Sequence, residues 1–498
     1  MGTFAIREQQ VAVSAAPPGR HVRLFRQFAT IEPGEGRSVA LFFCYAFLLL
    51  LCYYIAKTLR EPLLLHHASA AAKSYAYAAV ALVLLVVVPL YGAVFRRAAK
   101  ARVAVWVTTF FVANLTGFAV AARLGLDVGF IYYVWVGVFG VTIVAQFWAH
   151  AADAFDVGSG QRLFPTIMAG ATLGGLAGPL VVRWLYNPGA PWSLMLVATV
   201  LLAATLPLVG WTRESVPAGS RSHGARDVGT RSGQTRGGGF ALILRDRYLL
   251  LLAALAVVLN CVNTTGEYIL TELVVRHVDQ QIQLQASLDK GALIAKFYGD
   301  YFFVVNALTA LTQVLLVARL FRWIGVQGAL LVLPILAVLG YGLVLWIPIF
   351  AVLRIVKIAE NCADYSITNT ARQALYLPLP TDAKYEGKIA TDTFLWRCGD
   401  LLQAGIVFAG SRWLGFGVQQ FAIVNMALGL VWLGVAIALA RRYSVCTGTR
   451  ERARITRSIG RRLDAVLAGT PGIRRAALAR SAYGFSALAT AFTALIRP

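Results

Sequence analysis

Residues 354–400 read RIVKIAENCADYSITNTARQALYLPLPTDAKYEGKIATDTFLWRCGD, and long apolar segments flank the first half of this stretch. The first half should therefore begin inside a membrane helix. At about 100° per residue, five of its charged side chains fall within roughly one third of the helix circumference: Arg354, Lys357, Glu360, Asp364 and Arg372. A charge at the centre of a membrane helix costs roughly 2.5–3.5 kcal/mol. Because five unpaired charges would offset a typical folding free energy of roughly 5–15 kcal/mol, these side chains must pair with one another or line a wet cavity.

The composition is that of a protein embedded in a membrane. Of the 498 residues, 58% are hydrophobic and 14% are charged, which is far more apolar than a soluble domain. Runs of about 20 apolar residues recur, which predicts an all-α polytopic membrane protein. The net charge of +23 would suggest nucleic-acid binding in a soluble protein. Here the cations cluster in loops and tails beside predicted spans, so we expect anionic lipids at the cytoplasmic face as partners, and no nucleic acid.

Twelve transmembrane helices are predicted, in two groups of six. Their ranges are 38–62, 74–95, 103–122, 129–151, 164–185, 192–211, 248–274, 294–318, 324–346, 348–372, 389–411 and 417–440. Basic residues cluster after even-numbered spans, whereas the loops after odd-numbered spans carry few, among them Lys73 and Arg183. Since basic loops stay in the cytoplasm, both termini should be cytoplasmic, in a multi-pass protein of the cell (inner) membrane.

A long loop rich in Gly, Ser and Arg separates the two groups of spans, and its composition is typical of a flexible linker. The predicted domains are a cytoplasmic N-terminal segment at 1–37, an N-terminal six-helix half at 38–211, the linker at 212–246, a C-terminal six-helix half at 247–440 and a basic cytoplasmic tail at 441–498. Two six-helix halves describe a major-facilitator-like architecture. The tail should form either a basic amphipathic helix on the inner leaflet or a solvated extension.

A short internal repeat relates the two halves. ADAFDVGSGQRLFP at 152–165 and ADYSITNTARQALYLP at 363–378 share an Ala-Asp pair, then a basic residue, then an aromatic residue and a proline. The repeat makes two residues of the first half, Asp153 and Arg162, the counterparts of Asp364 and Arg372.

The pattern DYS…ARQALYLPL…KYEGKIATD resembles the signature of the nucleotide transport family, the bacterial and plastid ATP/ADP translocases. Five positions match the family pattern in order: Pro378, Lys384, Gly387, Lys388 and Asp392. Gln373 stands where the family has an acidic residue. The resemblance implies a major-facilitator-like fold and one of three activities: exchange of ATP for ADP, nucleotide import with protons, or the carriage of related dinucleotides.

Span 1 ends in YYIAKTLREPLLL, in which Lys57, Arg60 and Glu61 share a helix face. The segment resembles the family's first span, where Lys57 matches an Arg, Arg60 a Lys and Glu61 an Asp. Two cations beside one carboxylate leave a net positive charge, which suits a phosphate-bearing substrate. The alternative is that the long basic side chains anchor the end of the helix at the membrane interface.

Spans 7 and 8 add further candidates. Five polar side chains in VLNCVNTTGEYILTELV should face the cavity, and Glu267, at the family's acidic position, should pair with a cation of span 1 in the empty state. Span 8, KFYGDYFF, resembles a family segment with Asp300 in place. Its aromatic residues Phe297, Tyr298 and Tyr301 could stack on a purine, although such a cluster is more often an interfacial belt.

A glycine-rich segment, AGATLGGLAGP, lies in span 5. Gly170, Gly174 and Gly178 follow small-xxx-small spacing. This pattern is typical of close helix packing rather than of a phosphate-binding loop.

The chain carries no GxxxxGK[ST], GxSxG or HExxH motif and no convincing metal cluster. We therefore expect no enzyme activity, no cofactor and no metal site, and transport would run on gradients or exchange. The prediction is a monomeric ATP/ADP-type antiporter that binds a nucleotide or another phosphate-bearing anion and transports it by alternating access. The alternatives are a facilitator-type transporter of another anionic metabolite or lipid, and a non-transporting membrane scaffold. The predicted substrate-binding residues are Lys57, Arg60, Glu61, Asp153, Arg162, Glu267, Asp300, Lys357, Glu360, Asp364 and Arg372.

Overall fold

The computed structural model describes residue 32 and residues 34–97, 100–216, 238–347, 349–380, 387–388 and 390–468. Before the linker the helices are α2 (Gly36–Leu65), α3 (Ala70–Arg97), α4 (Lys100–Arg123), α5 (Gly129–Ala154), α6 (Val157–Leu185), α7 (Trp192–Ala203) and α8 (Thr205–Ser215). After it they are α9 (Gly238–Arg245), α10 (Arg247–Leu284), α11 (Lys290–Thr312), η2 (Gln313–Val317), α12 (Ala318–Trp346), α13 (Phe350–Ala363), η3 (Asp364–Thr368), α14 (Asn369–Leu375), η4 (Ala390–Leu395), α16 (Trp396–Arg412) and α17 (Val418–Ala468), where η marks a π-helix. Most of the predicted linker, residues 217–237, lies outside the described residues.

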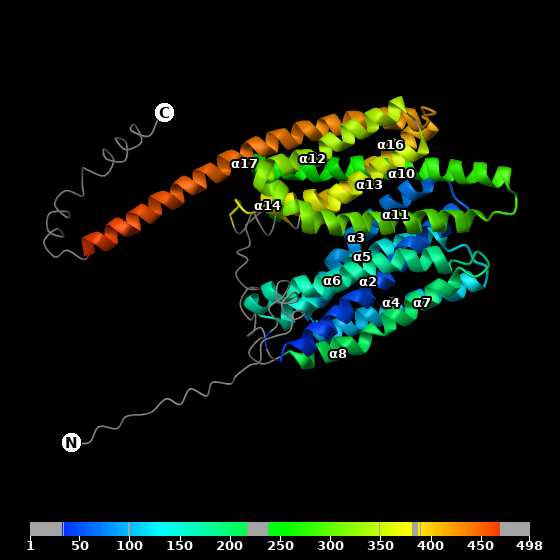
Figure 1. Cartoon of the computed structure of the whole chain (residues 1–498), viewed down its shortest axis with the longest axis horizontal. Helices are drawn as coiled ribbons and strands as arrows, with labels where there is room; N and C mark the ends of the chain where they lie inside the picture. Colours follow the sequence, from blue (N-terminus) through cyan, green and yellow to red (C-terminus); the bar gives the residue numbers. More distant parts are fainter. Residues whose placement is uncertain are drawn as a thin grey trace, which may run out of the picture.

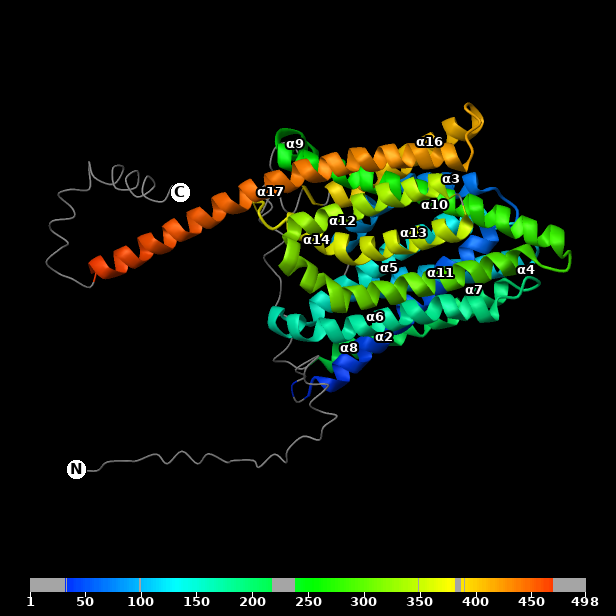
Figure 2. The same ribbon diagram turned by 45° about the horizontal axis from the view of Figure 1, so that its top comes forward.

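The helices form two elongated bodies that lie side by side (Figure 1). The first body contains α2 to α8 and the second contains α9 to α17, with α3 packed against α10 and α16 where the bodies meet. In the 45° turn of Figure 2 the second body comes forward and partly covers the first. Each body has its own apolar core. We call the end where α2 begins and α8 ends the linker end, and the end where α2 and α10 terminate the far end.

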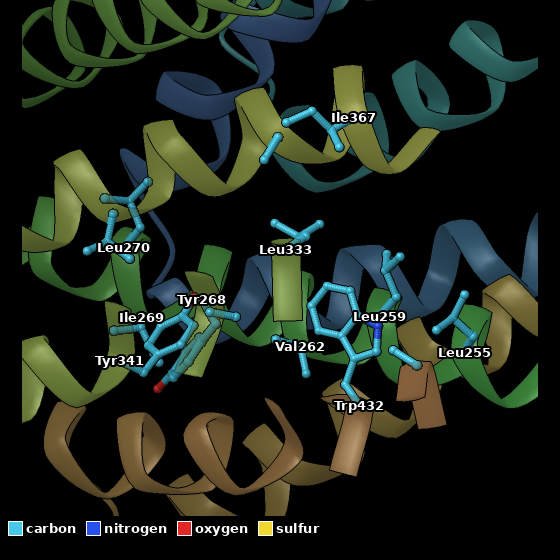
Figure 3. Close-up of a cluster of buried hydrophobic side chains, with 14 of the residues drawn as sticks. Leu255, Leu259, Val262, Tyr268, Ile269, Leu270, Leu333, Tyr341, Ile367 and Trp432 are labelled. Carbon is cyan, nitrogen blue, oxygen red and sulfur yellow. The ribbon is translucent and has the colours of Figure 1, made fainter. Parts of the chain in front are cut away.

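The core of the second body is built around α10. Figure 3 shows Leu259 and Val262 of α10 gathered with Leu333 of α12 and Trp432 of α17. All four side chains are at most 4% exposed. Because α10 is covered by neighbours from several directions, Asn260, Thr264 and Glu267 in its middle are also buried inside the protein.

Nine helices within the described residues are long and apolar enough to cross a membrane, six before the linker and three after it. The protein is therefore a multi-pass membrane protein. One of the nine segments, Lys290–Trp346, has 57 residues and contains Gly325, whose φ of 67° and ψ of −178° interrupt the helix. The predicted spans at 348–372 and 389–411 are not among the nine, because their helices are short and carry several charged residues.

Three aspartates begin helices at the ends of the bundle. Asp156, Asp246 and Asp289 each accept a hydrogen bond from a backbone N–H in the first turn of α6, α10 and α11. Such caps satisfy donors that have no partner within the helix. The side-chain and backbone hydrogen bonds from Ser159 hold the pKa of Asp156 below its ordinary value.

The last helix leaves the bundle. α17 is one helix of 51 residues, and it runs straight past the linker end in Figure 1. Residues 441–468 therefore continue the last span without a break. Of the two alternatives for the tail, this favours the extension over the amphipathic surface helix, since a helix collinear with a span does not turn into the membrane plane.

The glycine face of α6 packs on α2, as the spacing predicts. A Cβ atom added to Gly170 would lie 2.5 Å from the carbonyl oxygen of Phe43, and one on Gly178 would lie 2.6 Å from Cβ of Tyr54. A Cβ atom on Gly174 would overlap the carbonyl oxygen of Phe47. Backbone atoms cannot move aside as a flexible side chain can, so the two helices approach each other only because these residues are glycines.

We expect Gly174→Ala to lower the melting temperature of the purified protein by several degrees, because α2 and α6 must separate to admit the methyl group. Gly117→Ala in α4 is the matched control, since no atom lies within 4 Å of its added Cβ. The control should melt at or slightly above the wild-type temperature, since Ala favours helix by roughly 1 kcal/mol over Gly. Equal melting temperatures for the two variants would contradict the packing argument.

Candidate functional site

Six buried charged side chains form one continuous series of ion pairs between the two bodies, here called the ion chain. In order they are Arg60, Glu61, Lys73, Glu267, Lys357 and Glu360. The successive N–O distances are 3.4, 3.0, 3.6, 3.7 and 3.0 Å. The first three residues belong to α2 and α3, and the last three to α10 and α13. The link that crosses between the bodies runs from Lys73 to Glu267.

The ion chain is balanced, with three cations and three carboxylates, and none of the six residues is more than 8% exposed. Neutral polar groups add hydrogen bonds to it. Asn361 donates to Glu267 at 3.0 Å, and Tyr341 donates to Glu360 at 3.0 Å. Lys73 donates to the hydroxyl of Tyr298 at 3.3 Å. Buried charges survive only when paired and hydrogen-bonded in this way.

Lys73 is the member that sequence reasoning missed. It was interpreted as one of the few basic residues in the loop between spans 1 and 2, but it lies in the first turn of α3 and is 1% exposed. Consequently Glu267 pairs with Lys73 and Lys357, whereas the expected ion pair with a cation of span 1 does not form among the described residues. No local signal identifies it, because a lysine at the end of a predicted span is typical of a loop or interfacial residue.

The end of span 1 does not serve as an interfacial anchor. Arg60 is 7% exposed and Glu61 is fully buried, and the guanidinium of Arg60 lies 4.1 Å from the ring centre of Tyr133. The belt expected in span 8 is likewise wrong for Tyr298 and Tyr301, which are fully buried beside the ion chain. Both groups lie inside the protein because α3, α5 and α10 cover them.

The charged face expected at 354–372 is divided by a π-helical turn. Only Lys357 and Glu360 join the ion chain, whereas Arg354 lies over the ring of Phe297 at 5.5 Å. η3 begins at Asp364, which is buried, and the extra residue of a π-turn shifts the helix register. Arg372 therefore points elsewhere, pairing with Asp392 at 3.1 Å and stacking over Trp396 at 4.3 Å.

The remaining predicted residues lie away from the ion chain. At the linker end, Arg162 forms two hydrogen bonds of 2.9 Å with Glu35, and Asp153 is exposed. Asp300 pairs with Arg183, which joins α11 of the second body to α6 of the first. Arg183, interpreted as a loop residue, thus makes a second ionic contact between the bodies.

A cavity of about 610 Å³ lies between the bodies, on the linker side of the ion chain. Its walls come from α2, α6, α11, η2, η3 and α14, with Lys57, Tyr54, Tyr365, Asn306 and Asn369 among the lining residues. Within the described part of the chain, no carboxylate forms an ion pair with Lys57. Its ammonium instead lies over the rings of Tyr54, Phe302 and Tyr365, an interaction of roughly 0.5–2 kcal/mol per contact.

No family model matches the chain. It is 21% identical over 364 residues to "ADP,ATP carrier protein 1" of Chlamydia trachomatis, a match that covers 65% of this chain and 66% of the relative, slightly less than two thirds of its length. The protein of the same name from Chlamydia pneumoniae is 21% identical over 365 residues, covering 64% of this chain and 68% of the relative.

Solved transporters share the fold. The nucleoside transporter NupG superposes with a TM-score of 0.60 at 14% identity and covers 81% of this chain and 98% of its own. A POT family transporter in complex with 5-aminolevulinic acid gives 0.60 at 11% identity, with 82% and 96% covered. A bacterial homolog of the human lysosomal transporter Spinster gives 0.54 at 10% identity, with 84% and 99% covered. The chain therefore shares the fold of these solved transporters.

We expect Lys73→Ala to destabilise the protein by roughly 3–5 kcal/mol, because Glu61 and Glu267 both lose a partner while buried. Thermal or denaturant unfolding of the purified protein measures the change. Arg276→Ala is the control, since its pair with Glu272 is exposed and contributes roughly 0.3–0.5 kcal/mol. Adding Glu61→Gln to Lys73→Ala should recover part of the loss, and a fully additive double variant would show that the two charges are not coupled.

Proposed function

We propose that the protein exchanges nucleotides across the membrane, in the manner of an ATP/ADP antiporter, by alternating access. One observation carries the proposal: Lys57 is a cation without a carboxylate partner in the described chain, on the wall of a cavity between the two bodies. The neighbouring charges are already balanced within the ion chain, so a ligand that completes the charge of Lys57 must be an anion. Phosphate oxygens accept strong, charge-assisted hydrogen bonds from ammonium groups.

The size of the cavity and the names of the relatives support a nucleotide. Small-molecule sites usually enclose roughly 300–1,000 Å³, and the cavity of about 610 Å³ lies within that range. Two relatives are named ADP,ATP carriers, and one structure with the same fold is a nucleoside transporter. These names favour a nucleotide over other phosphate-bearing anions.

The contacts at the far end suggest how exchange would proceed. The pairs Lys73–Glu267 and Arg183–Asp300 hold the bodies together there, while the cavity lies toward the linker end. Opening the far end requires both pairs to break. The empty cavity carries the positive charge of Lys57, and a bound anion would neutralise it before the two bodies rock against each other. Without a bound anion, this change of conformation would be unfavourable.

The proposed topology has twelve spans with both termini cytoplasmic. Gly325 interrupts Lys290–Trp346, which would then cross twice, and the segments 350–375 and 390–412 would add the remaining two crossings. Both of these carry charged residues that are covered by protein, which explains why hydropathy alone does not count them.

Ligand binding tests the proposal. We expect ATP and ADP to raise the melting temperature of the purified full-length protein, with about 2.7 kcal/mol gained at 100 times the dissociation constant. Lys57→Ala should abolish the gain, because the anion loses its unpaired cation. GTP, NAD and orthophosphate complete the panel, and exchange of labelled ADP in liposomes would then measure transport.

Lys290→Ala is the matched control, since Lys290 pairs with Asp279 at 3.0 Å away from the cavity. This variant should keep the wild-type response to ATP and ADP. Stabilisation by another anion alone would favour the alternative facilitator. No response across the panel from a folded protein would remove the nucleotide proposal and favour a scaffold.

The Arg183–Asp300 pair predicts how readily the far end opens. Asp300→Asn weakens the Arg183 pair, so amide hydrogen exchange in the turn at 186–191 should become faster than in the wild type. Glu272→Gln removes a half-buried carboxylate whose pair lies within α10, and it should leave that turn unchanged. Unaltered exchange in Asp300→Asn would show that this pair does not hold the far end closed.

A further inference from the structure

The rings around Lys57 form a fixed set, here called the ring set: Tyr54, Phe302 and Tyr365. Their centres lie 5.1, 4.8 and 5.9 Å from the Lys57 ammonium. Tyr54 and Phe302 come from the two different bodies, and Tyr365 belongs to η3. The ring set therefore surrounds one side chain with aromatic rings from both bodies.

Tyr54 is held in place. Its hydroxyl donates to Asn306 of α11 at 3.3 Å, and Asn306 donates to the carbonyl oxygen of Gly175 at 2.7 Å. A Cβ atom on Gly175 would lie 3.1 Å from the Tyr54 ring. The ring is thus packed against α6 and bonded across the interface, so its face keeps its position when Lys57 moves.

Tyr365 is the accessible member of the ring set. It is 42% exposed and lines the cavity, whereas Phe302 is 6% exposed. Because Tyr365 lines the cavity with this exposed fraction, part of its side chain is accessible to a ligand there. Neither its hydroxyl nor its ring is needed to complete the ion chain, whose members are paired without it.

We propose that Tyr54 and Tyr365, the cavity-lining rings of the ring set, form a base-binding subsite that Lys57 occupies until a phosphate displaces it, and that Tyr365 makes the site select nucleotides over simple phosphates. The inference rests on the proposed function and names its specificity-determining residue. A phosphate oxygen attracts an ammonium more strongly than a ring face does, so a bound phosphate moves Lys57 off the rings. The faces of Tyr54 and Tyr365 then become available in the same cavity, where a planar base attached to that phosphate stacks on them.

The test compares ADP with pyrophosphate, which has the same phosphate chain and no nucleoside, on the purified full-length protein by calorimetry. The wild type should bind ADP about 5- to 150-fold more tightly than pyrophosphate, the range that stacking of one base provides. Tyr365→Leu should lose this preference while its affinity for pyrophosphate stays unchanged. Tyr365→Phe keeps the ring and should keep the preference. Lys57→Ala should weaken the binding of both ligands.

The other outcomes are separable. If Tyr365→Leu keeps the preference, or weakens both ligands equally, the subsite is overturned while the anion site stands. If phosphocholine binds more tightly than pyrophosphate, the rings recognise a cationic group and the base assignment is overturned. If neither ADP nor pyrophosphate binds the wild type, the proposed function itself fails, and the subsite fails with it. The melting temperature of each variant checks that it is folded.

Discussion

The cost of burying charge is the constraint on which the rest of this structure depends. Three cations and three carboxylates lie between the two bodies, almost without contact with solvent. Each is stable there only because its neighbours in the ion chain neutralise it. Since the Lys73–Glu267 link crosses from one body to the other, the packing of the bodies and the pairing of the charges depend on each other. A change in one requires a change in the other.

Lys57 differs from its neighbours because it lies outside this balance. Aromatic rings hold its ammonium, and these contacts are weaker than an ion pair with a carboxylate. The site therefore combines a stable, neutral interface with one cation, Lys57, that is not held by a carboxylate of the ion chain. In a membrane protein this arrangement allows an anion to bind without first breaking a buried ion pair. It also explains why the cavity, rather than the ion chain, is where we place the ligand.

Sequence patterns predicted the features that depend on one helix at a time. The apolar spans of the first body and the glycine face of α6 follow from hydropathy and spacing, and the structure confirms both. Features that depend on contacts between distant segments were not accessible. Lys73 resembles a loop residue until Glu61 and Glu267 are placed beside it, and Arg372 left its expected face because a π-turn changes the register after Asp364. No local pattern specifies either.

The two walls of the cavity differ in stiffness. On one side α2 and α6 meet backbone to backbone through glycines, so this wall moves as a single unit. On the other side the chain contains η2 and η3, and all three π-helical segments of the described chain belong to the second body. A π-turn holds one residue more than an α-helical turn and can pass that residue along the helix at little cost in hydrogen bonds. The second body thus has π-turns beside the cavity, where helical pitch can change, whereas the described residues of the first body have none.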